Sequence, residues 1–152
     1  MSNDPKLELR AIKTNRALSE ETLYFSAKLF VDGKLAATVA NRGTGGCNTY
    51  SWVSKETEAR VNAWANQQDL EFKFECLDQI IDKLLSSAEV AARLRRLCRK
   101  ETLFRLRNDK QGAWRVVKKP YDDTLRLKIE EHAKGTLECI ANVDIDAAVK
   151  FC

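Results

Sequence analysis

Basic residues concentrate in one segment of the chain, residues 93–119. The segment holds eleven lysines and arginines but only two acids, a formal charge of +9, whereas the other residues together carry −5. Guanidinium groups offer forked donors that match the oxygens of phosphate and carboxylate. The segment therefore predicts a surface for an anionic partner, either nucleic acid or an acidic protein. The alternative is a solvated surface whose charges pair locally with acidic residues.

The spacing within this segment predicts where the charges lie. Residues 102–107 and 113–118 alternate as two strands of a hairpin, with Phe104 and Leu106 on the buried face. Because side chains alternate along a strand, the hairpin arginines are expected together on the exposed face. Tyr121 adds a ring that can stack on a base. The predicted binding residues are Arg93, Arg96, Arg99, Arg105, Arg107, Arg115, Lys118, Lys119 and Tyr121.

A glycine-rich segment, residues 41–48, is a second candidate site. Its sequence is Asn-Arg-Gly-Thr-Gly-Gly-Cys-Asn, and the backbone N–H groups of such a loop can cradle an anion. It lacks the Gly-Lys-Ser/Thr ending of a phosphate-binding loop, and it does not match GxGxxG. A tight turn with a structural role is the competing interpretation. The candidate loop residues are Asn41, Gly43, Gly45, Gly46 and Asn48.

Cys47 and His132 are the residues that would suit nucleophilic catalysis. Cys47 is the only cysteine outside an apolar pattern, and His132 is the only histidine. Together they would supply a nucleophile and a base, but neither carries a local signature. A single histidine and the lack of a CxxC pair predict no metal site, and no cofactor is expected. The sequence therefore favours a binding protein over an enzyme, with a small enzyme that uses Cys47 as an alternative.

Periodicity and turn signals predict the elements that hold these residues. Strands are expected at 6–12, 22–31 and 34–40, with Asp32-Gly33 as a hairpin turn. Helices are expected at 54–67, 76–99 and 122–133, and a closing strand at 136–141. Residues 70–75 fit either a short strand or the start of the next helix. The prediction is an α+β fold, a single compact domain over residues 1–152, with mainly antiparallel sheet (two β-hairpins) packed with three helices.

Length and composition limit the class of protein. A chain of 152 residues with 44% apolar and 32% charged residues is typical of one soluble globular domain. The sequence shows neither a membrane-length apolar stretch nor an apolar N-terminal signal, so a cytoplasmic protein without a membrane partner is expected. The five cysteines are odd in number and unpaired in spacing, which predicts free thiols. The oligomeric state stays open.

Residues 25–34 and 39–48 also resemble a known group of proteins. Their strand, Asp-Gly turn, strand and Asn-x-Gly-x-Gly-Gly loop are similar to those of small uncharacterised accessory proteins of bacteriophages, prophages and plasmids. The segment around Leu103–Leu106, with Trp114 and Lys118, resembles the C-terminal part of the same group. The resemblance implies a mobile-element gene product in a bacterial cytoplasm, and it assigns no functional residue.

The expected function is therefore non-catalytic. A phage or mobile-element accessory protein would bind nucleic acid, or a host complex that handles nucleic acid, through its basic hairpin and helix end. The alternative is a protein inhibitor of a host defence system, similar to an anti-CRISPR protein, that binds an acidic host protein directly.

Overall fold

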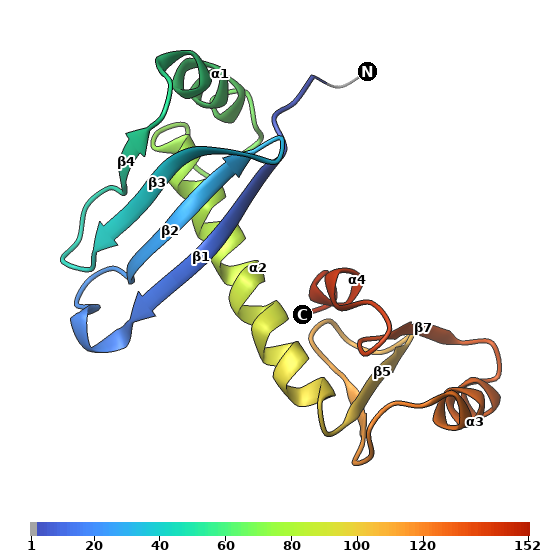
Figure 1. Cartoon of the computed structure of the whole chain (residues 1–152). Helices are drawn as coiled ribbons and strands as arrows, with labels where there is room; N and C mark the ends of the chain where they lie inside the picture. The colour runs from blue at the N-terminus through green and yellow to red at the C-terminus, as the bar shows by residue number, and fades with distance from the viewer. Residues whose placement is uncertain (1–2) are drawn as a thin grey trace. The chain divides into compact units, whose positions relative to one another are not determined.

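The computed structural model describes residues 3–152 and has an α+β fold (Figure 1). The prediction of an α+β fold with mainly antiparallel strands is confirmed, because every strand pairing in the described residues is antiparallel. The chain divides into two compact units, an amino-terminal unit that ends at Leu85 and a carboxy-terminal unit that begins at Ser86. No helix within residues 3–152 combines the length and apolar character needed to cross a membrane.

The amino-terminal unit is built on a four-stranded sheet in the order β1-β2-β3-β4. The strands are β1 (Leu7–Asn15), β2 (Tyr24–Val31), β3 (Lys34–Arg42) and β4 (Thr49–Trp52), with a short 3-10 helix, Arg16–Leu18, after β1. Asp32 and Gly33 have φ values of 52° and 80°, which confirms the predicted hairpin turn. Strand β4 was not predicted, because its four residues pair with β3 only after the glycine-rich loop reverses the chain.

Two helices cover one face of this sheet. Helix α1 (Lys55–Ala65) begins after Ser54, whose side chain accepts a hydrogen bond from the backbone N–H of Thr57. Helix α2 (Cys76–Cys98) follows, and its first three turns belong to this unit. Their apolar side chains join alternate residues of β2 and β3 in one core, whose most buried members are Leu29, Val39, Val61, Ala65 and Ile81. Residues 70–75 form neither a strand nor a helix.

The carboxy-terminal unit contains a three-stranded sheet in the order β6-β5-β7. Its elements are β5 (Thr102–Leu106), β6 (Arg115–Val117), α3 (Asp123–Ala133), β7 (Leu137–Ile140) and α4 (Ile145–Val149), together with the last turns of α2. Helix α3 begins at the predicted cap, Asp122, and ends at Lys134, which takes the left-handed conformation. The predicted second hairpin and closing strand are confirmed, although β6 is shorter than expected.

Strand β5 is covered on both of its faces. Leu103 packs in an apolar cluster with Leu94 and Ala148, whereas Phe104 packs in a second cluster with Ile129 and Ile140. Because consecutive residues of a strand point to opposite faces, both faces of β5 are buried. The first four residues of the strand are accordingly buried, Arg105 included. The expectation that this hairpin exposes one polar face is therefore wrong.

Candidate functional site

The clearest charged feature is the basic side of the last turns of α2. Arg93, Arg95, Arg96, Arg99 and Lys100 are all exposed. At 3.6 residues per turn, Arg93, Arg95 and Arg96 occupy one contiguous half of the helix circumference, and Arg99 and Lys100 follow in the turn directly after α2. The other half carries the buried residues Ala91 and Leu94 and the half-buried residues Leu97 and Cys98. The core therefore fixes which side of the helix presents the charges to solvent.

Residues 93–100 contain five basic residues and no acidic residue. Elsewhere in residues 3–152, ion pairs are formed by Arg10, Arg60, Arg105, Arg115 and Arg126. None of the five basic residues at the end of α2 takes part in them. This short stretch therefore carries a formal charge of +5.

Lys118 and Lys119 lie beside the end of α2. Thr102 pairs with Val117 across β5 and β6, and its hydroxyl donates a hydrogen bond of 2.9 Å to the carbonyl oxygen of Lys119. The two lysines therefore leave β6 next to the residues that connect α2 to β5. Both are exposed. We call the combined set the basic surface: Arg93, Arg95, Arg96, Arg99, Lys100, Lys118 and Lys119.

Arg105 does not belong to this surface. Its residue exposure is 3%, and its Nε donates to Glu138 Oε2 at 2.6 Å. Its Nη2 donates to the carbonyl oxygen of Asp109 at 2.8 Å, and its guanidinium carbon lies 4.7 Å from the ring centroid of Phe151. The prediction of an exposed Arg105 is wrong because other elements pack on both faces of β5. The side chain instead ties together β7, the turn after β5 and the end of the chain.

Three other predicted binding residues lie apart from the basic surface. Arg115 forms a two-pronged ion pair with Asp109, at 3.0 and 2.9 Å. This pairing raises the pKa of Arg115 and lowers that of Asp109. Arg107 is exposed but lies just past the other end of β5. Tyr121 is half-buried against the cluster that contains Phe104, so its ring is not a free stacking platform.

The glycine-rich loop is held by its own hydrogen bonds. The buried side chain of Asn41 accepts from Gly43 N at 2.8 Å and donates to Asn48 Oδ1 at 3.1 Å and to the carbonyl oxygen of Gly46 at 3.2 Å. The carbonyl oxygen of Gly43 accepts hydrogen bonds from the backbone N–H groups of residues 20–22. A loop whose polar groups are used internally is suited to a structural role.

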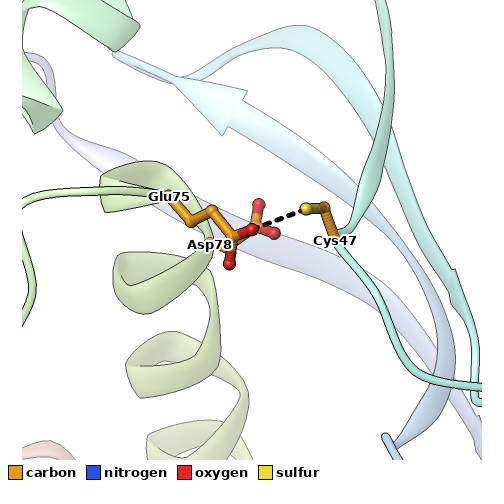
Figure 2. A group of neighbouring side chains, drawn as sticks. All are labelled: Cys47, Glu75 and Asp78. Atoms are coloured by element: carbon orange, nitrogen blue, oxygen red, sulfur yellow. Dashed lines mark hydrogen bonds between the residues drawn. The ribbon is translucent and has the colours of Figure 1, made fainter.

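Cys47 lies near the end of this loop and points toward the start of α2 (Figure 2). Its Sγ donates to Glu75 Oε1 at 2.8 Å. Asp78 accepts from the backbone N–H of Asn48 at 2.8 Å and from the hydroxyl of Tyr50. Sequence reasoning missed Glu75 and Asp78, because they lie about 30 residues from Cys47 without any local signal linking them. The bonds to Asp78 hold β4 against α2 within the amino-terminal unit.

Cys47, Glu75 and Asp78 offer three potential metal ligands, a thiol and two carboxylates, but their arrangement does not require an ion. One ligand atom each from Cys47, Glu75 and Asp78 lies within 4.8 Å of the others, and thiolates and carboxylates bind divalent cations such as zinc. Both carboxylates already accept hydrogen bonds from protein donors. The hydrogen bond and negative charge of Glu75 raise the pKa of Cys47, which favours the unreactive thiol form.

Replacing Glu75 by glutamine is expected to make Cys47 more reactive. The substitution removes the negative charge and the hydrogen bond that raise the pKa of the thiol, so the thiolate fraction at pH 8 should rise. The rate of alkylation by iodoacetamide, followed at Cys47 by peptide mass spectrometry, should increase severalfold. Cys152, also exposed, is the internal control and should react at an unchanged rate. An unaltered rate at Cys47 would show that Glu75 does not control the thiol.

Comparisons of the chain with protein-family models, with curated proteins and with solved structures find no match. The residues and their geometry therefore carry the functional proposal.

Proposed function

We propose that the carboxy-terminal unit binds nucleic acid through the basic surface. The observation that carries this proposal is the group of five exposed basic residues, Arg93 to Lys100, on the last turns of α2 and the turn that follows it. The charge of the unit supports it, because residues 86–152 hold fifteen basic and ten acidic residues, a formal charge of +5. Residues 1–85 hold eleven basic and twelve acidic residues, a formal charge of −1. The long-range attraction for an anion is thus confined to one unit.

The kind of contact follows from which side chains are free. Half or more of the hydrogen bonds between proteins and DNA go to phosphate and sugar, and arginines and lysines are common donors to them. Arg105 is buried and Tyr121 is half-buried, so neither is available to contact a base. Binding is therefore expected to depend on the backbone, with little sequence preference and a steep dependence on salt. A role of this kind suits an accessory protein of a phage or plasmid, the group that residues 25–48 resemble.

The test is a titration of a fluorescein-labelled DNA duplex, followed by fluorescence anisotropy at several salt concentrations. The unmodified protein should bind at low salt, with log Kd varying linearly with log salt. The variant R93Q/R96Q/R99Q should bind much more weakly, and the magnitude of its salt slope should fall by about 1 for each phosphate contact removed. Glutamine keeps the helix propensity of these positions, so the fold should be retained.

The matched control is K13Q/K28Q/K34Q. It removes the same three charges from exposed positions of the amino-terminal unit and should leave both Kd and slope unchanged. An equal loss in the two variants would show that net charge alone drives binding, and no binding by the unmodified protein at low salt would overturn the proposal.

A second candidate function is direct binding to an acidic host protein, as an inhibitor of a defence system would do. The observation that favours it is an apolar groove on the carboxy-terminal unit, lined by Phe104, Val116 and Ile129 among others. Contact with a phosphate backbone requires no apolar groove. A pull-down from bacterial lysate with nuclease separates the two functions, since a protein partner would survive the treatment and bound nucleic acid would not.

A further inference from the structure

The groove lies between α3 and the β5–β6 pair, is open to solvent and has a volume of about 350 Å³. This volume falls in the range of pockets that hold a ligand or a large side chain. Five of its eight lining residues are apolar, and the other three carry nitrogen donors at the rim. The apolar residues are Phe104, Val116, Val117, Leu125 and Ile129. The rim residues are Arg115, Lys128 and His132.

One wall of the groove is an open strand. The order β6-β5-β7 leaves β6 paired only with β5, so its other side is an edge of the sheet. Val116 is 48% exposed, a large fraction for an apolar strand residue. Val116 and Val117 are consecutive and face opposite sides of the strand. A groove that both residues line therefore reaches the edge of β6.

The charged residues that line the groove are all basic. No acidic residue lines it, whereas Arg115 and Lys128 are positively charged and His132 offers a nitrogen donor. Asp109 neutralises part of the charge of Arg115 but also fixes the position of its guanidinium. Lys128 forms no ion pair within the described residues 3–152. The complementary ligand is therefore apolar at its centre and acidic at its flanks.

We propose that this groove binds an extended acidic segment of a protein partner. The segment lies along the edge of β6, inserts an apolar side chain between Val117 and Ile129, and directs flanking carboxylates to Lys128 and Arg115. Addition of a strand at a sheet edge supplies backbone hydrogen bonds, and the groove supplies side-chain specificity. The proposal goes beyond nucleic-acid binding, because none of the seven residues of the basic surface lines the groove.

The test measures binding of a fluorescein-labelled peptide with the sequence Glu-Glu-Leu-Glu-Phe-Glu-Glu. Its leucine and phenylalanine are two residues apart, so they share one side of an extended chain. Two peptides of equal length are the controls, one with lysine in place of each glutamate and one with serine in place of both apolar residues. The acidic apolar peptide should bind at least tenfold more tightly than either control. Equal binding of the three peptides, or none up to millimolar concentration, would overturn the proposal.

Variants locate the bound peptide on the protein. Lys128→Glu and Val116→Asp change exposed groove positions, so both should fold, and each should weaken binding of the acidic peptide at least fivefold. Lys150→Glu makes the same charge change outside the groove and should leave binding unaltered. Tight binding that neither groove variant weakens would refute the proposed site.

Two further measurements separate this proposal from its alternatives. R93Q/R96Q/R99Q should bind the peptide normally even though it binds DNA weakly, so either proposal can fail without the other. In analytical sedimentation, the unmodified protein should not self-associate through the groove. If it does self-associate, and Val116→Asp abolishes this association, the occupant of the groove is a second copy of this chain and the acidic partner is ruled out.

Discussion

Replacing Arg105 by alanine is expected to destabilise the carboxy-terminal unit by about 3–5 kcal/mol, the usual cost of removing one partner from a buried ion pair. The guanidinium is nearly inaccessible, with 4% side-chain exposure, whereas Glu138 retains 26%. Loss of the arginine leaves Glu138 partly buried without its cation. It also removes the donors for the carbonyl oxygens of Asp109, Lys110 and Phe151. The partial exposure of Glu138 places the expected loss toward the lower end of the range.

Denaturation in urea, followed by circular dichroism, measures the effect of Arg105→Ala. Arg107→Ala is the matched control, because it removes the same side chain two residues along the chain from an exposed position. Its free energy of unfolding should change by less than about 0.5 kcal/mol. Arg105→Lys should fall between the two, since an ammonium group retains the charge but lacks the fork of donors. Equal stability of the two alanine variants would contradict the structural role of Arg105.

Gly43→Ala is expected to destabilise the amino-terminal unit by at least about 3 kcal/mol. Its φ of 78° lies in the left-handed region, which costs an alanine roughly 1–2 kcal/mol. A Cβ at this position would also lie 2.3 Å from the carbonyl oxygen of Leu18, a backbone atom. Relief of that clash requires movement of Gly43 and disruption of its bonds to Asn41 and to residues 20–22, each worth about 0.5–1.5 kcal/mol.

Gly46→Ala separates steric contact from backbone conformation. Gly46 has a φ of 92° in the same loop, but a Cβ there would meet nothing within 4 Å. Only the cost of the left-handed backbone conformation remains, so Gly46→Ala should lower the free energy of unfolding by about 1–2 kcal/mol. We compare the stabilities of Gly43→Ala and Gly46→Ala by their urea midpoints and by hydrogen exchange of the amides of Glu20 and Glu21. If the two variants lose the same stability, the close approach of Gly43 to Leu18 has no energetic consequence.

Local signals in the sequence account for much of the fold. The Asp32-Gly33 turn, the caps at Ser54 and Asp122 and the apolar periodicity of α2 each depend on a few neighbouring residues, and the structure confirms them. Strand β4 lacked such a signal. Its residues are placed by pairing with β3, for example Tyr50 with Val39, and this pairing depends on the path of the glycine-rich loop.

The site was harder to predict, because burial depends on which strands become neighbours. Alternation correctly placed Arg105 and Phe104 on opposite faces of β5, but the sequence of this strand does not reveal that α4 and the last turns of α2 cover the face that carries Leu103 and Arg105. The partner of Arg105, Glu138, lies 33 residues away, and the partner of Cys47, Glu75, lies 28 residues away. In contrast, the exposure of Arg93, Arg96 and Arg99 was predictable, because helical periodicity alone separates them from Leu94.

The short edge strand β6 has a consequence for aggregation. Long apolar edges template the addition of identical strands, the route by which many β-proteins form insoluble assemblies. Strand β6 has only three residues, begins with Arg115 and is followed by Lys118-Lys119-Pro120. A second copy of this strand would bring the same cations to the edge and would be repelled. These residues are therefore expected to act as gatekeepers that oppose polymerisation through the edge of β6.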